Sequence, residues 1–339
     1  MKRVCNVFLV LLLVLLLAPQ SGWSAPEAAD SSGEAAMAGA GEAEGNGKAE
    51  EEGPPDTFGP LVTESAEPVE KGALEIQPIF SFSFVTDSLT PSWRRASAGG
   101  GYTSFAYEQQ ITYGLWDNLE VYTIIPILVN MARSVNEPAP DGSRSATSSG
   151  IGDINLTWKY RLVGETQTLP TVSAIFATDF PTGKYRRLNP RALGTDEMGG
   201  GAFVFTTGFA VSKYVKPVIL YANLFYSMGT AFTNRGEDDD GNPIDVRNYP
   251  RDFVTVNLAA EYPLTKKWIA LLELVSYWDG GRFFGHKSNV PPAALVSVVP
   301  GIEYMATDRV SMALGVQVDV LGKNTDAAVT PILSLIFSF

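Results

Sequence analysis

The sequence predicts an all-β chain, a transmembrane antiparallel up-and-down β-barrel of about 12 strands. Three observations predict this fold class. From residue 71 onward, apolar and polar residues alternate with a period of two, and no stretch sustains the 3.6-residue period of a helix. The alternating segments are about ten to fourteen residues long, which is enough for a tilted strand to cross a bilayer. The connections are alternately short and long, as in barrels with short turns at the periplasmic end and long extracellular loops.

The first 25 residues predict a secretory signal peptide. Lys2 and Arg3 precede an apolar run over 7–18, and small residues lead to an exit near Ala25. The single cysteine, Cys5, lies within this segment. The exported chain is therefore expected to contain no disulfide.

Residues 26–70 differ in composition from the rest of the chain. They are rich in Ala, Gly, Pro and Glu, and they carry most of the net charge of −12. Such a segment buries too little apolar surface to offset the entropy lost on ordering, so we predict a disordered acidic periplasmic segment over 26–70. The barrel is expected over 71–339, where the charges nearly balance, and nucleic acid is not an expected partner.

The expected strands follow from the alternation, segment by segment. They are 74–84, 105–115, 119–129, 154–162, 169–180, 201–212, 217–228, 252–262, 267–278, 293–304, 310–320 and 328–339. In the last of them Val329, Leu333 and Phe337 share one face, and the chain stops on Phe339. An open apolar edge would aggregate, so we expect this strand to close onto the first one. Its alternation and terminal Phe resemble the signal by which bacterial outer-membrane barrels are recognised by the barrel-assembly machinery.

Aromatic residues recur where strands enter the short turns. They are Tyr113, Tyr160, Tyr214, Tyr262 and Tyr304. Amphipathic rings prefer the headgroup level of a bilayer, so this spacing predicts a periplasmic aromatic girdle. Aromatics that cap the core of a soluble β-sandwich are the alternative.

If the apolar face meets lipid, the opposite face lines the lumen. The candidate lumen residues are Glu108, Glu120, Asp153, Lys159, Arg161, Tyr221, Phe225, Glu273, Glu303 and Asp319. Carboxylates outnumber basic groups among them, which disfavours anionic solutes. Twelve strands enclose a space between the filled eight-stranded barrel and the aqueous porin. The sequence is compatible with a narrow conduit for a partly apolar solute and also with an interior that apolar groups pack shut.

Four prolines fall inside expected strands: Pro78, Pro126, Pro300 and Pro331. Each removes a hydrogen-bond donor from the sheet. Bulges or kinks are one interpretation. A lateral gap in the wall, through which an apolar solute reaches the membrane, is the other.

Short motifs resemble an outer-membrane family named for the meta-pathway (MetA-pathway) of phenol degradation, whose members are predicted transporters. The most recognisable is Gly150-Ile-Gly-Asp153 with the Lys-Tyr-Arg-Leu run that ends at Leu162; Asp179-Phe-Pro-Thr-Gly183 and Gly301-Ile-Glu-Tyr304 are similar to later parts of the family. The resemblance covers about 70–339. It implies a barrel and transport of hydrophobic or aromatic compounds, without residue-level binding sites.

Two loops suggest chemistry. His286 and Ser288 resemble the histidine–serine signature of outer-membrane phospholipase A, in which they act as general base and nucleophile. Val290 stands where that pattern has a glycine. The acidic stretch 237–245 has carboxylate spacings that could bind Ca²⁺, without the full loop of a calcium site. We predict no catalytic residue, metal or cofactor.

The sequence therefore predicts a multi-pass barrel in the bacterial outer membrane that lets small, hydrophobic or aromatic solutes pass passively. Its expected partners are outer-membrane lipids, the assembly machinery through the strand ending at Phe339, and the solute. Two alternatives stay open. One is a lipid hydrolase that uses His286 and Ser288, and the other is a plugged structural or surface-binding barrel.

Overall fold

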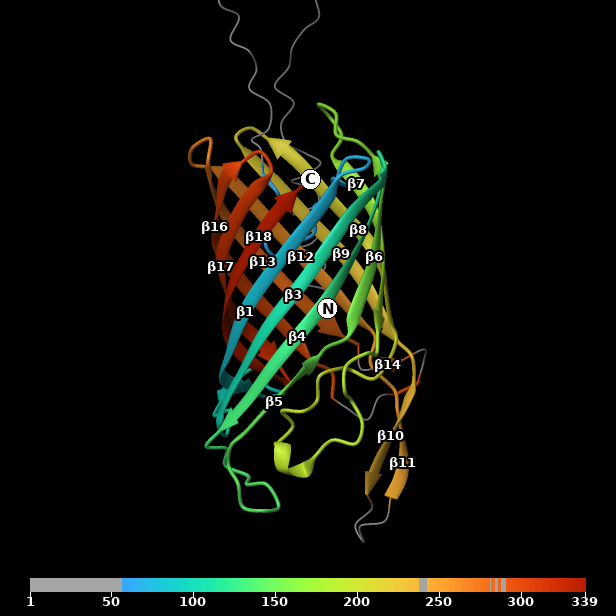
Figure 1. Ribbon diagram of the computed structural model, residues 1–339, viewed down its shortest axis with the longest axis vertical. Helices are drawn as coiled ribbons and strands as arrows, with labels where there is room; N and C mark the ends of the chain where they lie inside the picture. The colour runs from blue at the N-terminus through green and yellow to red at the C-terminus, as the bar shows by residue number, and fades with distance from the viewer. Residues whose placement is uncertain (1–56, 238–242, 281, 284–285, 288–290) are drawn as a thin grey trace, which may run out of the picture. The chain divides into compact units, whose positions relative to one another are not determined.

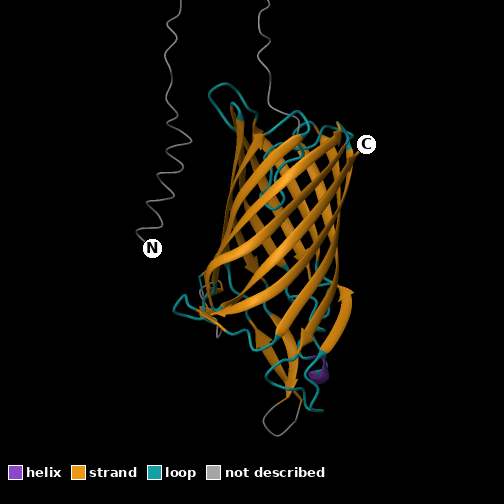
Figure 2. Ribbon diagram, turned by 90° about the vertical axis from the view of Figure 1, so that its left-hand side faces the viewer, coloured by secondary structure: helices purple, strands orange, loops and turns teal. Residues whose placement is uncertain are grey.

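A closed barrel forms the body of the protein (Figures 1 and 2). The computed structural model describes residues 57–237, 243–280, 282–283, 286–287 and 291–339. Among these residues, one antiparallel sheet has 14 strands, of which β2 (Arg95–Ala96) and β5 (Ala146–Ile151) are short additions beside β1 and β4. The other twelve follow one another in chain order, and β18 pairs with β1 to close the ring. The predicted 12-stranded barrel is confirmed.

The wall strands lie close to the predicted segments, and several extend further toward the long loops. They are β1 (Leu74–Leu89), β3 (Gly101–Trp116), β4 (Leu119–Arg133), β6 (Ile154–Val163), β7 (Thr171–Phe180), β8 (Val204–Val215), β9 (Val218–Gly229), β12 (Phe253–Pro263), β13 (Trp268–Asp279), β16 (Ala294–Thr307), β17 (Val310–Lys323) and β18 (Thr325–Ser338). The two ends of the barrel chain are joined directly, because Phe339 N–H donates to Leu74 O at 2.9 Å.

The connections sort by length as predicted, except that the single residue Asn324 joins β17 to β18 at the long-loop end. Turns at 117–118, 164–170, 216–217, 264–267 and 308–309 lie at the end that carries Leu74 and Phe339. Longer loops at the other end contain β5, the 3-10 helix η1 (Pro190–Ala192), the hairpin of β10 (Phe232–Glu237) and β11 (Pro243–Asn248), and the pair β14 (Arg282–Phe283) and β15 (His286–Lys287). No helix in the described part of the chain is long and apolar enough to span a membrane.

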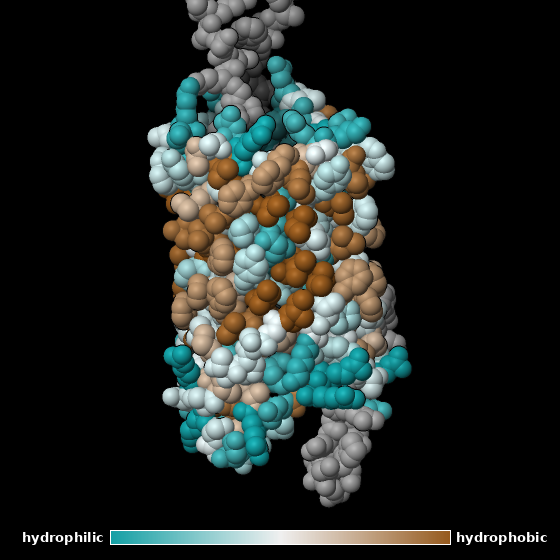
Figure 3. All heavy atoms as spheres, viewed as in Figure 1, coloured by the Kyte–Doolittle hydropathy of each residue, from teal (hydrophilic) through white to brown (hydrophobic). Residues whose placement is uncertain are grey.

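The outer face of the wall is apolar. Figure 3 shows hydrophobic side chains over the middle of the barrel, between two polar ends. Large side chains on this face are exposed in the isolated chain: Phe176, Phe209, Leu224, Leu272, Leu274 and Leu314 are among them. Contact with lipid or with a partner would remove this apolar surface from water, which is favourable. The pattern therefore suits a bilayer.

The inner face carries polar as well as apolar side chains. Its fully buried side chains include Glu261, Glu273, Glu303, Thr157, Ser173 and Ser297. In β18, Ile332, Ser334 and Ile336 are buried while their neighbours face outward, because successive strand residues point to opposite faces. Buried apolar residues form three small clusters within the described structure instead of one continuous core.

The four strand prolines coincide with interruptions of the strand pairing. Pairing of β1 with β18 skips the positions around Pro78 and Pro331, and pairing of β16 with β17 skips Pro300. At Pro126, β4 changes its partner from β6 to β5. Proline has no N–H to donate, so the breaks follow from its chemistry.

The aromatic girdle is present with one correction. Tyr113, Tyr160 and Tyr262 are exposed on the outer face near the short turns, and Tyr304 packs on Trp268 with ring centroids 4.6 Å apart. Tyr214 instead packs against the inward cluster of Ile219, Tyr221 and Ala259. The predicted position near the strand end is confirmed, but the side chain of Tyr214 lies on the lumen side.

Candidate functional site: the barrel lumen

Residues 57–70 lie inside the barrel. They form no strand, yet Ala66 is fully buried and Thr63 nearly so. The prediction of disorder over 26–70 is therefore wrong for 57–70, while residues 26–56 lie outside the described structure. The physical reason is that the segment is ordered by polar contacts with the wall and not by its own apolar residues. We call residues 57–70 the lumen segment.

Carboxylates of the wall hold one end of the lumen segment by its backbone. Glu273 on β13 accepts hydrogen bonds from the N–H groups of Leu61 at 2.8 Å, Val62 at 3.2 Å and Thr63 at 2.6 Å. On β16, Glu303 accepts from Thr57 Oγ1 at 2.8 Å. Hydrogen bonds to charged acceptors contribute about 1.5–3 kcal/mol each, so these carboxylates fix the segment strongly.

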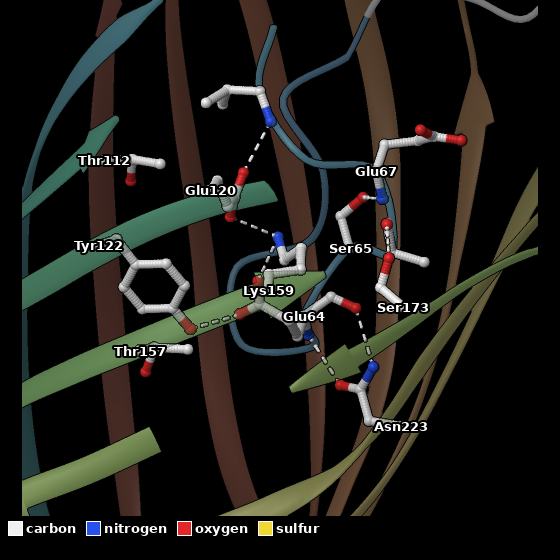
Figure 4. A network of polar contacts seen from close by, with 12 residues as sticks. Glu64, Ser65, Glu67, Thr112, Glu120, Tyr122, Thr157, Lys159, Ser173 and Asn223 are labelled. Atoms are coloured by element: carbon white, nitrogen blue, oxygen red, sulfur yellow. Dashed lines mark hydrogen bonds and ion pairs between the residues drawn. The ribbon is translucent and has the colours of Figure 1, made fainter. Parts of the chain in front are cut away.

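The middle of the lumen segment pairs with neutral side chains (Figure 4). Asn223 on β9 makes two bonds with Glu64, accepting from its N–H and donating to its carbonyl oxygen, both at 2.8 Å. Ala66 N–H donates to Ser212 Oγ at 2.9 Å, and Ser173 Oγ donates to Ala66 O at 2.5 Å. These pairs satisfy backbone groups that no sheet ladder reaches.

An ion-pair network joins the lumen segment to β4 and β6. Lys159 Nζ lies 2.5 Å from Glu64 Oε1 and 2.8 Å from Glu120 Oε1, and its side chain is nearly buried. Tyr122 OH donates to the other oxygen of Glu64 at 3.0 Å. Glu120 Oε2 accepts from Val69 N–H at 2.7 Å. Lys159 is thus the cation between one carboxylate of the wall and one of the segment (Figure 4).

Small wall residues make room for the segment. A Cβ at Gly315 would lie 2.4 Å from Leu61 Cδ1, and one at Gly114 would lie 2.0 Å from Glu70 O. Leu61 and Phe58 pack against Ile269 and neighbouring buried residues. The inner wall therefore matches the segment in shape as well as in polarity.

A cavity of about 510 Å³ lies beyond the lumen segment, toward the long loops. Its lining includes Phe253, Val275, Tyr277, Leu295, Ser297 and Gln317. On β13, Val275 is the next inward-facing residue after Glu273. On β17, Gln317 is the next inward-facing residue after Gly315. The segment and this cavity, which we call the lumen cavity, therefore occupy successive levels of one interior.

The lumen cavity combines apolar walls with neutralised charge. Phe253, Val275, Tyr277 and Leu295 offer aromatic and aliphatic surface. The ion pair between Arg251 Nε and Asp279 Oδ2, at 2.6 Å, also belongs to the lining. Because the two charges are matched, the cavity offers no net charge from this pair to a solute.

Most predicted lumen residues lie inside the wall. Those that are almost fully buried there are Glu120, Lys159, Tyr221, Glu273, Glu303 and Asp319. Phe225 packs on a buried cluster with Ala66, and Glu108 is half-buried. Arg161 lies at the short-turn rim, where it pairs with Glu67 at 2.8 Å.

Asp153 is placed differently from the other candidates. It follows Gly152 between β5 and β6 and accepts hydrogen bonds from Gly183 N–H at 2.9 Å and Gly200 N–H at 2.7 Å. It therefore holds a loop and does not line an open channel.

Several lumen contacts could not be found from the sequence. Ser173 and Ser212 looked like ordinary polar strand residues, and the amides of 57–70 carry no sequence signal. The one available signal was the excess of lumen carboxylates over lumen cations, because buried carboxylates need donors from elsewhere.

Some predictions fall outside the described residues. The signal peptide, Ser288 and the centre of the acidic stretch 237–245 are among them. The hydrolase and Ca²⁺ hypotheses consequently stay predictions. Within the described residues, no group of three or more acidic, His or Cys side chains could hold a metal ion.

A family model described as "Putative MetA-pathway of phenol degradation" matches residues 78–330. The chain belongs to this family. The COG4313 outer membrane channel from Pseudomonas putida F1 has a similar structure, with a TM-score of 0.63 and 16% identity over 81% of this chain and 98% of that one. Its likeness shows the fold.

Two further barrels are more distant. The translocator domain of the autotransporter NalP from Neisseria meningitidis has a TM-score of 0.47 and 11% identity, over 80% of this chain and 90% of that one. For the CymD monoaromatic hydrocarbon channel the TM-score is 0.43 and the identity 10%, over 80% and 89%. No curated protein matches the sequence. The family and the closed barrel identify the chain as an outer-membrane β-barrel.

Proposed function

We propose that this barrel is an outer-membrane channel for the passive passage of small hydrophobic or aromatic solutes, with the lumen segment across its periplasmic half. The observation that carries the proposal is the lumen cavity. An apolar cavity of about 150 Å³ is enough to bind benzene, and the lumen cavity measures about 510 Å³. Pockets of about 300–1,000 Å³ are usual for small ligands.

The chemistry of the cavity supports an uncharged solute. Phe253 and Tyr277 offer ring faces and edges to an aromatic solute. Gln317 and Ser297 already hydrogen-bond with Asp319, so their donors are largely engaged. The family description, which refers to phenol degradation, agrees with this solute class.

The test blocks the lumen cavity from one strand. Val275→Trp fills the cavity from β13, whereas Leu274→Trp, at the adjacent position, adds the same side chain to the lipid-facing surface. Uptake of labelled toluene by intact Gram-negative cells that make the protein should fall to background with Val275→Trp and stay unchanged with Leu274→Trp. Equal uptake by both variants would contradict the proposal.

The lumen segment also favours the plugged barrel as a second candidate function. Its contacts with Glu273, Glu303 and Lys159 hold it inside the barrel, as expected of a plug. A chain that lacks 57–70 separates the two candidates. Toluene uptake that is at background in the full chain and appears in the shortened chain would favour a barrel plugged by this segment, whereas uptake by the full chain would favour the channel.

We further propose that the C-terminal strand is the contact for the barrel-assembly machinery and that lipids cover the outer face. Phe339 ends the chain at the short-turn end and is 68% exposed. The exposed ring of Phe339 is accessible to an assembly partner.

A further inference from the structure

Two family-like motifs of the sequence meet at one junction in the wall. Thr182 Oγ1 donates to Gly152 O at 2.7 Å and accepts from Ile154 N–H at 3.0 Å. The carboxylate of Asp153 accepts hydrogen bonds from the N–H groups of Gly183 and Gly200, which lie near the two ends of the loop that joins β7 to β8. One side chain therefore pins both ends of this loop.

The pinned loop lies on the inward face of β4 and β5. Asn130 Nδ2 donates to Thr195 O at 3.2 Å, and the hydroxyls of Ser148 and Thr195 are 2.9 Å apart. Met198 is buried against Gly150, where a Cβ would lie 3.2 Å from Met198 Cγ. The loop is thus held in place before any solute arrives.

Beside this loop, the wall has an edge. Strand β5 pairs with β4 alone, and no described strand pairs with its other edge. A cavity of about 520 Å³ lies there, and its lining includes Ser148, Gly150, Ile151, Thr182, Lys184, Asp196 and Met198. Ser148 and Ile151 point to opposite faces of β5, so the cavity wraps around the strand edge. We call it the wall site.

Asp196 gives the wall site a specific chemistry. The residue is 6% exposed, and its Oδ2 accepts from Lys184 Nζ at 2.5 Å and Asn189 N–H at 2.9 Å. Burial acts to raise the pKa of Asp196, but the hydrogen bonds from Lys184 and Asn189 outweigh it and hold the pKa below its usual value. Asp196 is therefore ionised at neutral pH and can only accept.

The second oxygen of Asp196 has no partner. Oδ1 is buried and forms no hydrogen bond within the described structure. A buried acceptor without a donor costs about 1–3 kcal/mol. A solute that brought a hydroxyl or amine to this oxygen would remove that cost, and Ile151 and Met198 would contact its apolar part.

We propose that the wall site binds a small solute that has an apolar ring or chain and a hydrogen-bond donor directed at Asp196 Oδ1. The proposal deepens the proposed channel function, on which it rests for its solute class. It assigns to Asp196 the discrimination between donor-bearing solutes and plain hydrocarbons.

The test reads the wall site alone, through the methyl group of Met198. Phenol and toluene differ by one hydroxyl, and each is titrated into the purified mature chain in detergent with ¹³C-methyl methionine. Met198→Leu assigns the resonance. Phenol should shift it with a lower Kd than toluene does. If neither phenol nor toluene shifts the Met198 methyl resonance, the proposed wall site is wrong.

Asp196→Asn tests the donor contact. The side-chain oxygen of Asn can still accept from Asn189, while its NH₂ replaces Oδ1, so the shape is kept and the acceptor becomes a donor. The Kd for phenol should rise about ten-fold or more, because a bond to a charged acceptor is lost, with toluene unchanged. Asp141→Asn, which alters an exposed loop carboxylate near Arg191, should change neither.

Two results would overturn the donor contact. One is an unchanged Kd for phenol in Asp196→Asn, and the other is an equal loss for phenol and toluene, which would mean that the loop has moved. Ile151→Trp is a second variant that does not depend on the folding of Asp196→Asn. It fills the wall site from β5 and should abolish the Met198 shifts with both phenol and toluene. The lumen cavity is tested separately, because Val275→Trp should stop uptake and leave the Met198 shifts intact.

Discussion

Glu273 is the residue whose change should most directly release the lumen segment. Its carboxylate accepts hydrogen bonds from three successive N–H groups, those of Leu61, Val62 and Thr63. Glu273→Gln keeps the length of the side chain but replaces one oxygen by NH₂. A donor then faces donors, and the negative charge is lost.

The magnitude follows from these contacts. At least one of the three N–H groups loses its acceptor, which costs about 1–3 kcal/mol for a buried group, and the remaining bonds weaken without the charge. We expect a total loss of about 2–4 kcal/mol in the free energy that seats the segment. Since about 1.36 kcal/mol corresponds to a factor of ten, the displaced fraction should rise roughly 30-fold to several hundred-fold.

Planar-bilayer recordings provide the assay. The purified Glu273→Gln barrel should spend a larger fraction of time in a conducting state than the wild type, approaching the behaviour of the chain that lacks 57–70. Glu108→Gln is the matched control, because it removes a half-buried lumen carboxylate for which the structure shows no bond to the segment. If Glu108→Gln increases the conducting fraction equally, the cause is the loss of lumen charge. If Glu273→Gln leaves the conducting fraction unchanged, Glu273 does not hold the lumen segment in place.

Three further predictions concern other parts of the chain. Lys159→Met leaves two carboxylates without their cation, and removing one partner of a buried pair costs about 3–5 kcal/mol; thermal unfolding followed by gel mobility should show a lower midpoint, and an unchanged midpoint would contradict the network. Deletion of Phe339 should lower the amount of folded barrel in outer-membrane fractions, and an equal amount would remove its role in assembly. Purified protein should hydrolyse phospholipid no faster than Ser288→Ala; a rate that the substitution abolishes would support the hydrolase instead.

The family-like motifs have a structural role that their sequence did not reveal. Asp153 was expected to line the lumen, but it holds the loop between β7 and β8. Gly152 faces Pro126 so closely that a Cβ would lie 2.9 Å from its Cγ. The motif therefore builds the place where β4 changes partner, which no periodicity could indicate.

Residues 57–70 show why part of the candidate site escaped prediction. Composition measures the apolar surface that a segment can bury by itself, and for this segment that surface is small. The hydrogen bonds from its backbone to Glu273 and Asn223 join positions more than 150 residues apart in the chain. The alternation along the strand predicts that Glu273 faces the lumen. No local pattern in the sequence indicates which groups donate hydrogen bonds to it.

The sequence by itself determined the barrel, because the alternation along each strand fixes which side chains meet lipid and which face inward. It determined the number of wall strands, the closure by the strand that ends at Phe339, and the sorting of short and long connections. Only the tertiary structure decided what fills the interior. Backbone amides look alike in every sequence, and the closed ring alone brings those of 57–70 to the carboxylates of distant strands.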